Sequence, residues 1–417
     1  MDHDSSQSKS DSAAAEDITL PGDLYDYQSL LENDELATVL AVRRWAREQL
    51  DPVALDCWAQ ARFPHELVPS FAELCVAGLN YEEDGRPGAS RLLTGFIAME
   101  LARVDSSFGT FFGVHSGLAM GSISYLGSEE QKRRWLPDMR ALRKVGAFAL
   151  TEPHGGSDVA GGLETTARRE GDEWVLNGAK RWIGNGTFAD LVVVWARDVT
   201  DQRDGEDVDI RRQPVLGFVV QGGAPGFTAT KMEGKLALRA AQNADITLVD
   251  VRVPDADRLA GATSFQATNT VLRHTRGGVA WSAVGGMLAV YELAREYSLQ
   301  REQFGRPIGS FQLIQDLLAR MLGNVTAGFG MAVRVAQLQD AGIFRDEQGA
   351  LAKSFCTSRL RETVAWAREL FGGNGILLEN KVTKFFNDAE ALYSFEGTRE
   401  INALIVGRSA TGLSAFV

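Results

Sequence analysis

Cysteine and histidine are scarce in this sequence, and neither is spaced for metal binding. The only cysteines among its 417 residues are Cys57, Cys75 and Cys356, and the five histidines form no ligand pair. An odd number of widely spaced cysteines argues against a disulfide framework, so we expect free thiols in a reducing compartment. No metal site is predicted.

Positive charge and long apolar runs are also lacking. The chain has 43 Lys and Arg against 55 Asp and Glu, a formal net charge of -12, and no local basic run offsets it. This balance argues against nucleic acid as a partner. No apolar stretch approaches the ~18 to 20 residues that span a bilayer, so we expect no stable membrane insertion.

Neither end of the sequence carries a recognised targeting signal. The start is rich in Ser, Asp and Ala and lacks the basic flank and apolar segment of a signal peptide. The last three residues are not the peroxisomal Ser-Lys-Leu signal. We therefore expect residues 1–18 to form a disordered tail and the protein to be cytoplasmic.

Several common catalytic and nucleotide-binding motifs are missing. The sequence has no Gly-Lys-Ser or Gly-Lys-Thr phosphate loop, no His-Glu-x-x-His zinc pair and no Gly-x-Ser-x-Gly elbow. Residues 184–189 fit a loose Gly-x-Gly-x-x-Ala pattern, but a Val-rich strand follows them instead of a helix. A Rossmann dinucleotide-binding site requires a helix after this motif, so the sequence does not predict one here.

The pattern of apolar residues divides the chain into three parts. Residues 19–145 have helical periodicity, with Leu93, Ile97, Leu101 and Val104 on one face. Residues 258–417 return to that period and predict a helical bundle. Two apolar helix faces in this part indicate packing and no chemistry. One comprises Val284, Met287, Leu288 and Tyr291, and the other Ile314, Leu317, Leu318, Met321, Leu322 and Val325.

Residues 146–257 between these helical parts read as strands. The runs 191–195, 215–220 and 245–251 are rich in β-branched residues, and Asn177-Gly178 lies between two further runs as a hairpin turn would. The charged segment 198–212 is expected to be an exposed loop. The predicted fold is thus mostly α-helical with a central antiparallel β domain.

One acid stands out near the end of the chain. Glu396 follows Phe395 and precedes Gly397, so an aromatic ring can exclude water while glycine permits close approach. A desolvated carboxylate is a stronger base. The alternative is a surface acid at the start of a helix that begins at Thr398.

Three other segments hold unusual local chemistry. Residues 150–158 supply hydroxyls and exposed backbone N–H groups, 301–307 two guanidinium groups and an aromatic ring, and 371–375 a glycine cluster. Each also has an ordinary explanation: a β-turn, a helix terminus with surface charge, and a helix C-cap.

Taken together, these segments resemble the acyl-CoA dehydrogenase and acyl-CoA oxidase family over almost the whole chain. The resemblance is carried by residues 150–153 with 156–158, by Asn177-Gly178 with Lys180 and Trp182, and by residues 301–305, 372–375 and 396–398. Within the family, the sequence of these segments is most similar to the glutaryl-CoA dehydrogenase branch and the plant short-chain acyl-CoA oxidases. The family fold is a helical lobe, a barrel-like β domain and a four-helix bundle.

The resemblance implies FAD bound in a homotetramer. It assigns the following residues to the cofactor: Leu150, Thr151, Gly156, Ser157, Trp182, Ile183, Gly184, Gln312, Glu369, Thr398 and Glu400. Arg301, Phe304 and the turn at Gly372 and Gly373 match positions that reach the cofactor from a neighbouring subunit. Glu369 stands where many relatives have Gln.

The resemblance also implies the reaction. Glu396 matches the base that removes the α-proton of an acyl-CoA thioester while the β-hydrogen leaves as hydride to the flavin, giving a trans-2-enoyl-CoA. The substrate side would include Ser157, Gly109, Thr110, Arg276, Phe395 and Gly397.

Two departures from the family pattern bear on substrate and electron acceptor. Glutaryl-CoA dehydrogenases carry Arg-Ser where this chain has Gly109-Thr110, so an uncharged, short or branched acyl chain is expected. Gly184 replaces a Thr of many dehydrogenases and is shared with the plant oxidases. We expect an electron-transfer flavoprotein as acceptor; the alternatives are an oxidase that releases hydrogen peroxide, a glutaryl-CoA-type dehydrogenase and, last, a scaffold without turnover.

Overall fold

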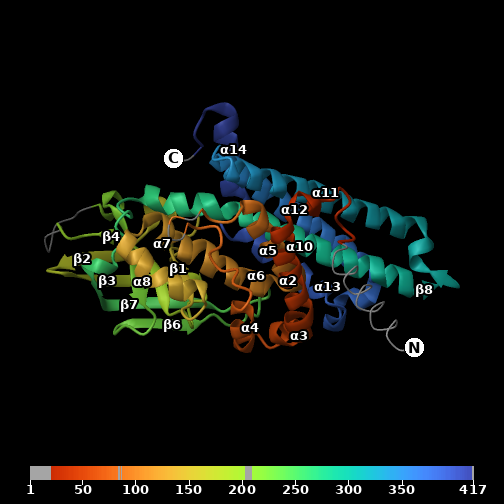
Figure 1. The fold of residues 1–417 in the computed structure, drawn as a ribbon, viewed down its shortest axis with the longest axis horizontal. Coiled ribbons are helices and arrows are strands. Elements are labelled where there is room, and N and C mark those ends of the chain that lie inside the picture. The colour runs from red at the N-terminus through yellow and green to blue at the C-terminus, as the bar shows by residue number, and fades with distance from the viewer. Residues whose placement is uncertain (1–19, 83–84, 86, 202–208, 416–417) are drawn as a thin grey trace.

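The computed structural model describes residues 20–82, 85, 87–201 and 209–415, and the predicted tail at 1–18 lies outside them. Figure 1 shows the β-sheet at one end of an elongated molecule and the short β8 strand at the other, with helices between them. This arrangement confirms the predicted fold, which is mostly helical with a β domain in the middle of the sequence.

Side-chain caps begin some of the helices before the sheet. Ser90 accepts a hydrogen bond from the Leu93 N–H at the start of α5, and Asp105 ends α5 and caps α6 through the Phe108 N–H. The predicted stripe through Leu93 is buried. The elements are η1 (Tyr27–Leu30), α2 (Asn33–Trp45), η2 (Ala46–Leu50), α3 (Asp51–Ala59), η3 (His65–Leu67), α4 (Val68–Ala72), α5 (Arg91–Val104), α6 (Ser106–Phe112), η4 (Gly113–Ala119), α7 (Met120–Leu126) and α8 (Glu129–Arg140).

The sheet is mixed, so the expected antiparallel pairing is only partly right. Strand order is β1-β4-β2-β3-β7-β6, with β5 also paired to β4. The β1–β4 and β2–β4 pairs are parallel, whereas β4 pairs antiparallel with β5, and the Val-rich run of β4 is buried almost throughout. The elements are β1 (Gly146–Ala149), α9 (Val159–Gly162), β2 (Thr166–Glu170), β3 (Glu173–Gly184), β4 (Leu191–Asp198), η5 (Ile210–Arg212), β5 (Val215–Gln221), β6 (Phe227–Lys231), β7 (Asn243–Pro254) and η6 (Asp255–Asp257).

The predicted hairpin at Asn177-Gly178 is wrong, because both residues lie inside β3. The register against β7 shifts between Leu176 and Gly178, which marks a β-bulge. Asn177 holds the bulge by exchanging two hydrogen bonds with Asp250, at 3.0 and 2.9 Å. The turn that joins β2 to β3 falls instead at Gly171, whose φ is 64°.

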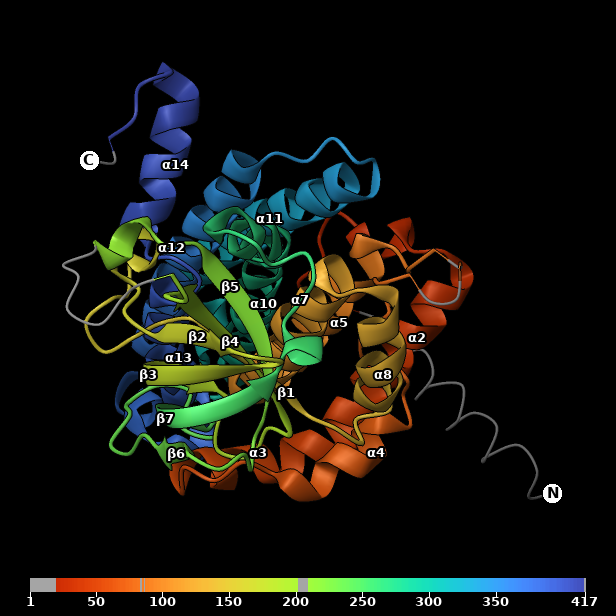
Figure 2. The same ribbon diagram turned by 90° about the vertical axis from the view of Figure 1, so that its left-hand side faces the viewer.

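The helices after the sheet form the predicted bundle. Val284 and Met287 of α10 are fully buried, whereas Leu313 near the start of α11 is 81% exposed. Helix α14 projects away from the body in both views (Figures 1 and 2). The elements are α10 (Phe265–Gln300), β8 (Glu302–Gln303), β9 (Arg306–Pro307), η7 (Ile308–Ser310), α11 (Gln312–Asp340), α12 (Asp346–Leu370), η8 (Gly372–Ile376), η9 (Leu378–Asn380), α13 (Val382–Ser394) and α14 (Arg399–Thr411).

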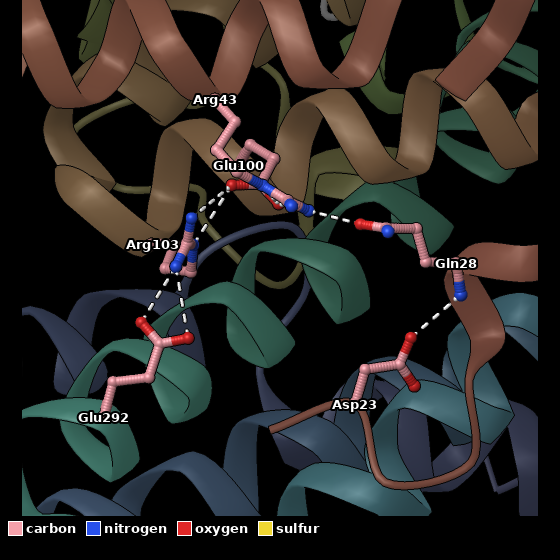
Figure 3. A network of polar contacts seen from close by, with 6 residues as sticks. All are labelled: Asp23, Gln28, Arg43, Glu100, Arg103 and Glu292. Carbon is pink, nitrogen blue, oxygen red and sulfur yellow. Dashed lines mark hydrogen bonds and ion pairs between the residues drawn. The ribbon is translucent and has the colours of Figure 1, made fainter. Parts of the chain in front are cut away.

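A buried charge network ties the first helical region to α10 (Figure 3). Glu100 on α5 accepts from Arg43 of α2 and from Arg103 on its own helix, each at 2.8 Å. Arg103 also pairs with Glu292 of α10, at 2.8 Å. Arg43 further donates to Gln28 at 2.6 Å, which brings in the segment before α2.

Candidate functional site

Glu396 occupies a tight turn between α13 and α14. The turn has two consecutive left-handed residues, Glu396 with φ 55° and Gly397 with φ 82°. A left-handed conformation is unusual for a residue with a side chain and is often retained at functional positions. Thr398 caps α14 by accepting from the Ile401 N–H at 3.2 Å, so the predicted cap exists, but Thr398 rather than Glu396 provides it.

The Glu396 carboxyl group faces polar groups of α10 and α12. Burial raises its pKa above the usual value, while Arg276, Lys353 and a hydrogen bond with Thr275 act in the opposite direction. Arg276 is paired with Asp346 at 2.5 Å, and its buried Nε has no hydrogen-bond partner among the described residues. The carboxyl group thus combines a desolvated setting with cations that stabilise its ionised form.

A second feature lies at the end of β3. The Trp182 side chain is 54% exposed and its backbone has φ 64°, so a large ring is held outward in a strained conformation. The segment after β1 packs against this strand: the Arg181 N–H donates to the Thr151 carbonyl at 2.8 Å, and buried Lys180 pairs with Glu152 at 2.7 Å.

The space beside this strand suits a flat heteroaromatic ligand with an anionic arm. Gly156 and Ser157 are exposed, and a Cβ added at Gly156 would meet no atom within 4 Å. Open backbone near an exposed aromatic ring provides stacking together with N–H donors. Thr151 and Trp182 fit this role together, whereas the side chains of Leu150 and Ile183 are buried.

The π-helical segment η4 connects the two features. A Cβ at Gly184 would come within 2.9 Å of Val114 Cγ2, and a Cβ at Gly117 within 3.5 Å of Thr275 Cγ2. One side of η4 therefore lies against the end of β3 and the other against the Thr275 that faces Glu396. Sequence reasoning missed η4 and Thr275; the spacing of Gly113 and Gly117 was the available signal. Segments of π-helix recur at functional sites.

The remaining residues that the family resemblance assigns to the cofactor belong to elements at the other end of the bundle. Tyr297 stacks on Phe371 with ring centroids 4.0 Å apart, and its hydroxyl accepts from Asn374 at 2.8 Å, which joins the end of α10 to the glycine cluster at 372–375. The β8–β9 hairpin there lies opposite the sheet (Figure 1). These residues belong to the end of α10, the β8–β9 hairpin, the start of α11, the end of α12 and η8, not to the strand that carries Trp182: Arg301, Phe304, Gln312, Glu369, Gly372 and Gly373.

The expected substrate residues are distributed unevenly. Phe395 and Gly397 belong to the Glu396 turn, and the expected cofactor residues Thr398 and Glu400 lie at the start of α14. Gly109 is buried in α6, where a Cβ would make ordinary contact with Ala102 at 3.4 Å. Thr110 donates to the Ser106 carbonyl at 2.7 Å. Phe108, Phe111 and Phe112, which flank Gly109 and Thr110, are buried in an aromatic cluster with Phe63 and Phe71.

Comparison with known families matches all three parts of the chain. The "Acyl-CoA dehydrogenase, N-terminal domain" matches residues 32–142, the "middle domain" 147–251 and the "C-terminal domain" 265–411. No helix in the described part of the chain is both long and apolar enough to cross a membrane.

Individual relatives agree with this family match. The chain is 31% identical to an acyl-CoA dehydrogenase of Bacillus subtilis, over 89% of this chain and 96% of that protein. It is 33% identical to the mitochondrial short-chain specific acyl-CoA dehydrogenase of Bos taurus, over 87% of each. A glutaryl-CoA dehydrogenase from Mycobacterium smegmatis, solved in complex with FADH2, superposes with a TM-score of 0.89 at 35% identity, over 95% of this chain and 100% of that one.

Proposed function

Because the chain belongs to the acyl-CoA dehydrogenase family, we propose that it catalyses the FAD-dependent α,β-dehydrogenation of an acyl-CoA thioester. The observation that carries this proposal is the desolvated carboxylate of Glu396, which lies in a left-handed turn. Thr275 neighbours this carboxylate, and Thr275 and the end of β3 both lie against η4. That geometry suits proton removal beside a bound flavin.

The protein's own groups perform the acid–base part of the reaction. Glu396 takes the α-proton of the thioester, and its backbone N–H donates to the thioester carbonyl, where negative charge develops. FAD, when bound, supplies the acceptor for the β-hydrogen and its electron pair. Phe395 is partly buried against the core and limits water around the carboxylate. The product is a trans-2-enoyl-CoA.

The cofactor site is proposed to form between subunits. Trp182 is on β3 of the sheet, which lies at one end of the molecule, whereas the β8–β9 hairpin that follows Arg301 lies at the other end, and Phe304 in that hairpin is 94% exposed (Figure 1). A second copy that brings its Arg301 end to the first copy's β3 completes the site, in the homotetramer that the family resemblance implies.

Arg301→Ala is therefore expected to weaken FAD retention, because a guanidinium group that pairs with the cofactor's phosphate is lost. Flavin content is measured after dilution and gel filtration. Arg212→Ala serves as the control, because Arg212 is 86% exposed in a turn before β5. If Arg301→Ala retains flavin as the wild type does, the proposed interface contact is wrong.

We propose an uncharged, short or branched acyl group as substrate. Gly109 supplies no cation for a distal carboxylate, and burying an unpaired charge is costly. Likeness to the bovine short-chain enzyme supports this choice. Likeness to the glutaryl-CoA dehydrogenase supports the alternative, a dicarboxylic acyl group.

The proposed electron acceptor is an electron-transfer flavoprotein. The second candidate is oxygen, because Gly184 leaves no side chain where many dehydrogenases carry Thr. Val114 favours the first candidate, because its methyl group occupies the space that a Cβ at Gly184 would approach. An apolar group there restricts a small molecule entering beside the flavin.

Anaerobic mixing of the holoenzyme with butyryl-CoA or glutaryl-CoA, followed by air, separates these possibilities. We expect butyryl-CoA to bleach the flavin faster, and the reduced flavin to persist in air until an electron-transfer flavoprotein is added. Prompt formation of peroxide would identify an oxidase. Faster bleaching by glutaryl-CoA would contradict the proposed substrate.

A further inference from the structure

We infer that Lys353 is a positioning residue that holds the Glu396 turn in place and supplies part of the positive charge that keeps Glu396 ionised. The inference rests on the proposed function of Glu396 as the base. Lys353 lies on α12, far from Glu396 in sequence, and its side chain is fully buried.

The ammonium group of Lys353 bridges the two sides of the Glu396 turn. Its Nζ donates to the Tyr393 carbonyl at 2.9 Å and to the Gly397 carbonyl at 2.6 Å. Tyr393 is in the last turn of α13, and Gly397 directly precedes the cap of α14. Lys353 therefore fixes the residues before and after Glu396 with two charge-assisted hydrogen bonds.

The turn needs such support because its conformation is unfavourable. Glu396 has φ 55°, and a residue with a side chain held there costs on the order of 1 to 3 kcal/mol. Asn402 adds a third bond by donating to the Gly397 carbonyl at 2.9 Å. Without Lys353, the Tyr393 carbonyl loses its side-chain donor and the backbone can relax toward a commoner conformation.

The positive charge of Lys353 also acts on the protonation of Glu396. The charged and polar groups that face Glu396 are Arg276 and Thr275 from α10 and Lys353 from α12; Glu400 of α14 acts on Lys353. Burial lowers the pKa of Lys353 to about 8, although Glu396 opposes that shift. Below that pH the positive charge favours the carboxylate form of Glu396, and the effect is lost as pH rises through it.

Lys353→Met in the holoenzyme tests this role. We expect the Glu396 carboxyl to titrate about one pH unit higher, read by infrared spectroscopy as the carboxyl signal that Glu396→Gln removes. The rate of flavin bleaching by butyryl-CoA at neutral pH should fall about 100-fold, with KM changed much less, because the base is misplaced. A rate change in the wild type near pH 8 should be absent from the variant.

Two further variants keep the test decisive. Lys384→Met removes another buried lysine, which pairs with Asp105 at 2.7 Å, and should lower stability without shifting the Glu396 titration. Lys353→Gln retains a donor without the charge, so it should show the titration shift with a smaller rate loss, and it replaces Lys353→Met if that variant does not fold.

An unshifted titration in both Lys353 variants would overturn the inference, as would an equal shift in Lys384→Met. These results are distinct from failure of the proposed function. In that case wild-type flavin would stay oxidised with every acyl-CoA, whereas the infrared titration would still report on Lys353.

Discussion

Glu396→Gln is expected to abolish bleaching of the flavin by acyl-CoA while the protein keeps its FAD. Glutamine has nearly the same shape but cannot accept the α-proton, and removing a general base costs typically 10² to 10⁴-fold in rate. No other carboxylate can replace it from the adjacent stretch of α10, because residues 272–278 contain none. Stopped-flow absorbance of the anaerobic holoenzyme gives the rate directly.

Glu390→Gln is the matched control for this experiment. Glu390 lies on α13, one helical turn before Ser394, and pairs with Arg361 at 2.7 Å on the exposed side of the helix. The same substitution at this position should leave the bleaching rate close to that of the wild type. Bleaching by Glu396→Gln at the wild-type rate would exclude Glu396 as the base.

Glu100→Gln is expected to give the largest loss of stability among these variants. Glu100 is fully buried and lies between Arg43 and Arg103, so neutralising it removes the carboxylate that both guanidinium groups share, although Arg103 keeps its pair with Glu292 (Figure 3). Breaking a buried pair in this way costs about 3 to 5 kcal/mol in the free energy of unfolding. Urea unfolding of the holoenzyme measures the change.

The pH dependence of this variant gives a second check. Burial works against the charge of Glu100, yet Arg103 and Arg43 together hold its pKa below the usual value. Such a carboxylate stabilises the fold above its unfolded pKa, and the stabilisation is lost as pH falls through the folded pKa. The difference between wild type and Glu100→Gln should therefore shrink in acid.

A surface ion pair provides the control for stability. Arg62 and Glu66 form a 2.8 Å pair with both side chains about half exposed. Solvent screens such pairs, so Glu66→Gln should change the unfolding midpoint little. A loss as large as that of Glu100→Gln would contradict the argument from burial, as would a Glu100→Gln variant as stable as the wild type.

Local sequence patterns predicted much of the fold. The helical stripe through Leu93 and Ile97 is buried as its period required, and the Val-rich run at 191–195 lies within β4. The hairpin prediction failed at Asn177-Gly178 because Asn-Gly also suits a β-bulge, and the choice depends on Asp250, more than 70 residues away. Register is set by such distant partners.

The candidate site was predictable only where its chemistry is local. Glu396 stands out because its neighbours in sequence are Phe395 and Gly397. Lys353 was missed because its partners, Tyr393 and Gly397, reach it only after α12 packs beside α13. A lysine among Ala350, Ala352 and Cys356 was the signal, since a charge in a buried stripe requires acceptors.

The most direct test of the proposed reaction is single-turnover reduction of the wild-type flavin by butyryl-CoA carrying deuterium at the α or the β carbon. If Glu396 takes the α-proton while the β-hydrogen leaves with its electrons, deuterium at either position should slow bleaching, and one trans-2-enoyl-CoA should form for each flavin reduced. Bleaching that is insensitive to deuterium at both carbons, or that yields no enoyl-CoA, would contradict the proposed chemistry.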